Sequence, residues 1–114
     1  MLYTNLNHIE SAGEYAKILS ENDNVVIICG RMGPLCVPVY LITEELEKQY
    51  PQVRFFDMEY DNPSSYFFHA MPEVRDLAEI PFVVYYRKGE VVMATAGLQS
   101  KKQITAILDN TFVV

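Results

Sequence analysis

The chain has 114 residues, 50% of them apolar, and a formal net charge of −6 at pH 7. This length fits a single domain, residues 1–114, with enough apolar side chains to bury one core without disulfides. The acidic balance argues against nucleic acid as a partner, and the apolar runs are too short to span a bilayer.

The first predicted elements are a strand, a helix and a second strand. Residues 2–6 can form a short strand, and a helix is expected to follow, because Ser11 and Glu14 have the spacing of a capping box. Residues 25–28 read VVII, a continuous β-branched run. Such a run is typical of a strand buried on both faces, at the centre of a sheet that helices flank.

A long helix, a strand and a helical segment are predicted next. Pro34 suits the first turn of a helix, where no backbone N–H is needed, and this helix should run to about Tyr50. A strand is expected over residues 53–60. The turn-forming residues 61–64 then lead into a helical segment that should end before Pro81.

The C-terminal part predicts a hairpin and a final helix. Residues 82–86 and 90–94 are apolar and β-branched, and they flank a turn over residues 87–89. Ser100 and Gln103 form a second capping box. The order β-α-β-α-β-α-β-β-α predicts an α/β protein with a mixed central β-sheet and helices on both of its faces.

Several motifs in this order resemble the thioredoxin family, over nearly the whole chain. Gly33 and Pro34, in the loop between strand and helix, are similar to the centre of the family's W-C-G-P-C motif. Ile80 and Pro81 resemble the family's cis-proline pair, and Lys88 with the residues after it resembles its hairpin. The resemblance implies the thioredoxin fold.

The active-site motif of the family is degenerate here. With Gly33 and Pro34 aligned, the family's attacking cysteine falls on Met32 and its resolving cysteine on Leu35. With the following helix aligned, the resolving position falls on Cys36. Neither alignment places a cysteine at the position of the family's attacking cysteine, and the chain contains no tryptophan. The resemblance therefore implies an atypical thioredoxin-like protein that lacks C-x-x-C.

The two cysteines, Cys29 and Cys36, are the candidate catalytic residues. A thiol just after Pro34 lies near a helix N-terminus, which favours the thiolate of Cys36. Cys29 would form or resolve a bridge with it if the loop brings the two Cα atoms within about 7 Å. We therefore predict a thiol–disulfide oxidoreductase in cell redox homeostasis, while the alternative is that both cysteines are simply buried small apolar residues.

A second function does not depend on sulfur. The family resemblance implies a groove beside a cis-proline, where an extended segment of a client protein can pair with the exposed backbone. The predicted groove residues are Met32, Gly33, Pro34, Ile80, Pro81 and Gly97. The alternative function is thus a redox-inactive protein-binding module, and a bridge that reshapes the groove on oxidation would lie between the two.

Partners and cofactors follow from the same residues. A client protein or extended peptide is expected, and a reductase would reset an oxidised pair. His8 and His69 share no ligand spacing with either cysteine, so we expect no metal and no cofactor. No signal peptide is readable, and cytoplasmic residence with reduced thiols is the expectation. The sequence leaves the oligomeric state open.

Overall fold

The computed structural model describes residues 2–77 and 79–112 and contains one five-stranded sheet. Its order is β1-β3-β2-β4-β5. The strands are β1 (Asn7–Ile9), β2 (Asn24–Gly30), β3 (Arg54–Glu59), β4 (Phe82–Arg87) and β5 (Glu90–Ala96). β1, β3 and β2 run parallel, whereas β4 and β5 form an antiparallel hairpin at the other edge. β2 is therefore the central strand, as its β-branched run predicts.

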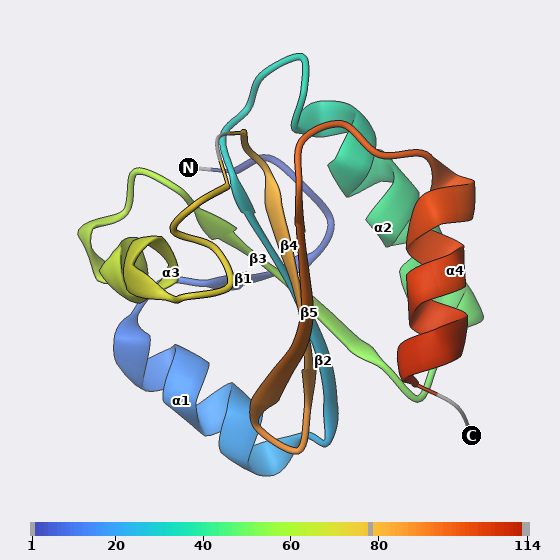
Figure 1. Ribbon diagram of the computed structural model, residues 1–114, viewed down its shortest axis with the longest axis horizontal. Coiled ribbons are helices and arrows are strands. Elements are labelled where there is room, and N and C mark those ends of the chain that lie inside the picture. The colour runs from blue at the N-terminus through green and yellow to red at the C-terminus, as the bar shows by residue number, and fades with distance from the viewer. Residues whose placement is uncertain (1, 78, 113–114) are drawn as a thin grey trace.

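Helices cover both faces of this sheet. Figure 1 shows α1 (Ala12–Glu21) and α3 (Tyr66–Ala70) on one side, and α2 (Val37–Gln49) and α4 (Lys101–Thr111) on the other. A short 3₁₀ helix, η1 (Pro63–Ser65), leads into α3. This arrangement confirms the predicted mixed sheet flanked on both faces. Within the described residues, no helix is long and apolar enough to cross a membrane.

The side chains of β2 alternate between two separate core clusters. Val26 and Ile28 pack into the cluster under α2 and α4, whereas Val25 and Ile27 pack into the cluster under α1 and α3. All four are fully buried. Successive residues of a strand point to opposite faces, so one strand stabilises both cores.

The local signals at the ends of several elements are confirmed. Ser11 caps α1 by accepting the Glu14 N–H at 3.1 Å. Lys88 and Gly89 have φ angles of 51° and 83°, the left-handed backbone that a tight hairpin turn requires. Ser100 and Gln103 form the predicted capping box at the start of α4.

The first strand lies later in the chain than the sequence predicts. β1 begins at Asn7, and the preceding residues 2–6 are not part of the sheet. Leu2 and Leu6 are buried, but the N–H groups of Tyr3 and Asn5 bind the side chains of Met32 and Glu44. Side-chain acceptors thus replace strand pairing in this segment.

The start of one helix also differs from expectation. α2 begins at Val37 and not at Pro34, because residues 33–36 form a turn in which the Gly33 carbonyl accepts the Cys36 and Val37 N–H groups. α3 ends at Ala70, and thus before Pro81 as predicted. The next residue, Met71, has extended backbone (ψ 133°), which is the conformation that a following proline imposes.

The capping box of α4 gives a first testable result. Ser100→Ala removes the acceptor of the Gln103 N–H, so we expect the free energy of unfolding to fall by about 1 kcal/mol. Chemical denaturation measures this change. Ser20→Ala is the matched control: this position of α1 is exposed and its hydroxyl donates only within its own helix, to the Lys17 carbonyl, so stability should change by less than about 0.5 kcal/mol. Equal effects of the two substitutions would contradict the capping role.

Candidate functional site

The structure separates the two candidate catalytic cysteines. Both thiols are free, and Cys29 is 0% and Cys36 2% exposed. Cys29 packs in the cluster under α1 and α3, together with Phe68, whereas Cys36 packs in the cluster under α2 and α4. Burial raises the pKa of Cys29 to about 12, and the neighbouring charge of Cys36 adds to this rise. Cys29 is therefore a protonated thiol at neutral pH.

Cys36 occupies the position just before α2 begins. It lies near the helix N-terminus, as predicted, but as the N-cap residue and not inside the first turn, and the cap carries no side-chain hydrogen bond to the helix. Its Sγ instead accepts the Arg31 N–H at 3.5 Å. A backbone donor and a helix N-terminus both stabilise negative charge on this sulfur.

Gly30, the last residue of β2, is the point where the parts of the site meet. A Cβ on this residue would lie 2.6 Å from Tyr40 Oη, 3.0 Å from Cys36 Sγ and 3.0 Å from Pro81 Cβ. Only a residue without a side chain fits there. Sequence reasoning missed both Gly30 and Tyr40: the four-residue spacing from Cys36 is a signal that could have found Tyr40, whereas nothing local marks Gly30 as a neighbour of the thiol.

A buried acid lies on the same side of the sheet as Cys36. Asp57 on β3 is 0% exposed; His8 Nδ1 lies 2.5 Å from its Oδ1, and the Thr4 hydroxyl donates to its Oδ2. Burial raises the pKa of Asp57, and the hydrogen bonds from Thr4 and His8 oppose this rise. The signal for this pair in the sequence is one acid inside the apolar run FFDM.

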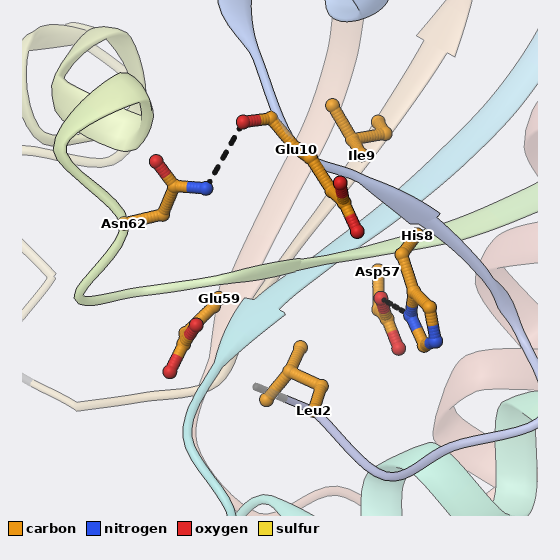
Figure 2. Close-up of a pocket in the computed structure, with 7 residues that line it drawn as sticks. All are labelled: Leu2, His8, Ile9, Glu10, Asp57, Glu59 and Asn62. Carbon is orange, nitrogen blue, oxygen red and sulfur yellow. Dashed lines mark hydrogen bonds and ion pairs between the residues drawn. The ribbon is translucent and has the colours of Figure 1, made fainter.

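His8 and Asp57 line a small cavity at the edge of the sheet. Figure 2 shows the pair beside Glu10 and Glu59, with the Asn62 amide donating to the Glu10 carbonyl at 3.1 Å. The cavity measures about 40 Å³, room for on the order of one water molecule. This space is too small for a substrate. Among residues 2–77 and 79–112, no group of three His, Cys, Asp or Glu could hold a metal ion.

Comparison with solved structures identifies this arrangement. A mutant thioredoxin from Halobacterium salinarum is similar with a TM-score of 0.80 at 18% identity, covering 100% of this chain and 98% of that chain. A Plasmodium falciparum thioredoxin gives a TM-score of 0.77 at 20% identity, covering 93% and 99%. Oxidised mitochondrial thioredoxin 3 from Saccharomyces cerevisiae gives 0.75 at 21% identity, covering 91% and 94%.

The chain has the thioredoxin fold. The predicted fold class is thereby confirmed at the level of structure. No protein-family model matches the sequence, and no curated protein matches it.

The groove residues expected from the thioredoxin fold fall into two sets. The Ile80–Pro81 peptide bond is cis, and the Pro81 carbonyl accepts the N–H of Gly97, which has a φ of 80°. Pro81 also packs beside the Gly30–Cys36 contact. The start of β4, the end of β5 and the loop after β2 lie at one end of the sheet (Figure 1).

The loop half of the predicted groove is more exposed. Met32 is 41% exposed and Pro34 is exposed, while Gly33 has open space around its Cα. The Met32 Sδ accepts the Tyr3 N–H at 3.4 Å, so the N-terminal segment borders this loop. The thioredoxin fold thus presents an apolar loop beside a buried cis-proline.

An ion pair fixes the start of the same loop. Arg31 donates two hydrogen bonds to the Asp61 carboxylate, at 2.8 and 2.9 Å, and its guanidinium lies 5.0 Å from the centre of the Tyr60 ring. The hydrogen bond from Arg31 lowers the pKa of Asp61. Both side chains are about half exposed, so this pair orients the loop more than it stabilises the fold.

Proposed function

We propose that this chain is a thiol–disulfide exchange protein in which Cys36 attacks and Cys29 is the second thiol. The observation that carries this proposal is the placement of the Cys36 Sγ. It lies at the start of α2, accepts a backbone N–H and borders the cis-proline of the thioredoxin fold.

The proposed exchange has two steps. The Cys36 thiolate attacks one sulfur of a client disulfide, forming a mixed disulfide and releasing the other client sulfur as a thiolate. Cys29 then attacks the Cys36 sulfur, and its proton passes to the departing client sulfur. Two electrons move to the client, and a Cys29–Cys36 bridge remains that a dithiol reductase must reduce.

Both steps need local motion. A client sulfur can reach Cys36, which is 2% exposed, only when neighbouring side chains move aside. Cys29 lies in the opposite core cluster, and its pKa of about 12 makes it a poor nucleophile at neutral pH until its surroundings change. Slow exchange is therefore the expected behaviour of this pair.

The partners in this proposal are a client protein and a reductase. The client would enter as an extended segment beside Ile80 and Pro81, where apolar Met32 provides an adaptable contact. Residence in the reducing cytoplasm belongs to the same proposal, because it would keep both thiols reduced between turnovers.

An insulin-reduction assay tests the proposal. Wild-type protein with dithiothreitol should accelerate the precipitation of insulin, and Cys36→Ser should lose this activity to the uncatalysed rate. Cys29→Ala should retain the first step and accumulate the mixed disulfide, which intact-protein mass spectrometry detects.

Two controls sharpen the assay. Ser20→Ala, at an exposed position of α1, should keep wild-type activity, and an unfolding curve must show that Cys36→Ser is folded under the assay conditions. An inactive wild type that forms no bridge under diamide would refute the exchange proposal. The groove beside Pro81 would then be left as a binding surface without chemistry.

A further inference from the structure

The hydroxyl of Tyr40 is buried without a hydrogen-bond partner. Tyr40 is 1% exposed, and among the described residues only its Oη and that of Tyr85 are buried side-chain polar atoms without a partner. A buried hydroxyl without a partner costs stability, so its position calls for a physical reason.

The thiol of Cys36 is a chemically useful neighbour of this hydroxyl. Tyr40 follows Cys36 by four residues, a spacing that places two side chains on the same face of a helix. The Tyr40 Oη and the Cys36 Sγ lie 2.6 and 3.0 Å from the same point, the Cβ position of Gly30. The oxygen and the sulfur are therefore neighbours in one buried space.

Tyr40 is suited to donate in this place. Burial raises the pKa of Tyr40 far above its usual range, and the nearby charge of Cys36 raises it further, so the phenol keeps its proton. The hydroxyl hydrogen rotates freely about the C–O bond and can turn toward the sulfur. A neutral thiol is a weak acceptor, whereas a thiolate is a strong one.

We propose that the Tyr40 hydroxyl donates a hydrogen bond to the Cys36 thiolate and, together with the Arg31 N–H, holds the ionised sulfur. The thiol proton leaves to solvent, and Tyr40 keeps its own proton throughout. This inference rests on the proposed function only in that a client disulfide is what the thiolate would attack. Ionisation of Cys36 itself does not require a client.

The other titratable groups around this sulfur do not supply that donor. They are Cys29 on β2, Asp57 on β3 with its partner His8 on β1, and Arg31 in the loop. Asp57 is an acceptor already bound to Thr4 and His8, and the Arg31 side chain is bound to Asp61. Tyr40 is thus the side-chain donor available to this sulfur.

The test is the pH profile of Cys36 alkylation by iodoacetamide. In a Cys29→Ala background, Tyr40→Phe keeps the ring and removes only the hydroxyl. The midpoint of the profile should move upward by about one pH unit, and the rate at about pH 7 should fall about tenfold. The limiting rate at high pH should not change.

Tyr85→Phe is the matched control. Tyr85 belongs to the same core cluster and also has a buried hydroxyl without a partner, and Cys36 is not among the groups that shift its pKa. Removing the Tyr85 hydroxyl should leave the midpoint of the alkylation pH profile unchanged. Ultraviolet absorbance of the thiolate provides a second measurement if alkylation is limited by access to the sulfur.

The outcomes separate this inference from the exchange proposal. An unchanged midpoint in Tyr40→Phe, with a folded protein, would overturn the donor role even if insulin reduction persists. A rate that falls equally at every pH would show that Tyr40 controls access only, and would also overturn it. A shifted midpoint in a protein inactive toward insulin would support the donor and refute the exchange.

Discussion

Gly30→Ala should lower the free energy of unfolding by about 2 kcal/mol. The new methyl group would lie 2.6 Å from Tyr40 Oη and 3.0 Å from both Cys36 Sγ and Pro81 Cβ. The nearest of these atoms ends the Tyr40 side chain, but that side chain is a rigid ring buried in the core, so overpacking displaces the helix, the sulfur or the proline. Urea denaturation measures the loss, and iodoacetamide should show an altered reactivity of Cys36.

Gly33 provides the control for this substitution. A Cβ on Gly33 meets no atom within 4 Å, so Gly33→Ala should change stability by less than about 0.5 kcal/mol. The two glycines are three residues apart and differ mainly in their surroundings. If both alanines cost the same, close packing around the Gly30 Cβ position would not be the cause of the loss, and the explanation from Tyr40, Cys36 and Pro81 would be wrong.

His8→Ala should destabilise the protein by about 2 kcal/mol at about pH 7, and less in acid. Removing His8 takes away one of the two side-chain hydrogen bonds to a fully buried Asp57 and leaves that oxygen without its partner. The expected loss of stability is smaller than for a fully buried pair because the His8 side chain is 31% exposed. Thermal or urea unfolding at several pH values measures the profile.

The sign of this pH dependence follows from the raised pKa of Asp57. Ionised Asp57 costs stability above its folded pKa, and this cost disappears below the unfolded pKa of about 3.9. Without His8 the folded pKa rises further, so the variant should recover stability as the pH falls toward about 4. In an Asp57→Asn background, His8→Ala should cost little. A loss that is independent of pH, or one that persists in that background, would contradict the pairing.

The sequence predicted the fold well where local signals and tertiary packing agree. The VVII run marked the central strand, and the cap at Ser100 and the turn at Lys88 marked ends of elements correctly. The first strand was misplaced because Leu2 and Leu6 are buried in a segment that pairs with side chains instead of a strand. Burial pattern alone does not distinguish these cases.

The site was harder to predict than the fold. Residue types identified the thiols, but the sequence did not show that Cys29 and Cys36 pack into different cores. The contact of Tyr40 with Gly30 joins α2 to the end of β2, and the contact of His8 with Asp57 joins β1 to β3. Such contacts depend on strand order and helix placement, which no local pattern encodes.

Cys29 and Cys36 pack on opposite faces of the sheet, and this placement affects how a bridge between them could form. Cys29 is held in the sheet between Met58 of β3 and Phe82 of β4. Because Cys29 packs into the cluster opposite Cys36, we expect bridge formation to require separation of the end of β2 from β3 and β4. Oxidation would then break backbone hydrogen bonds at the end of β2, and amide hydrogens there would exchange faster in the bridged protein than in the reduced one.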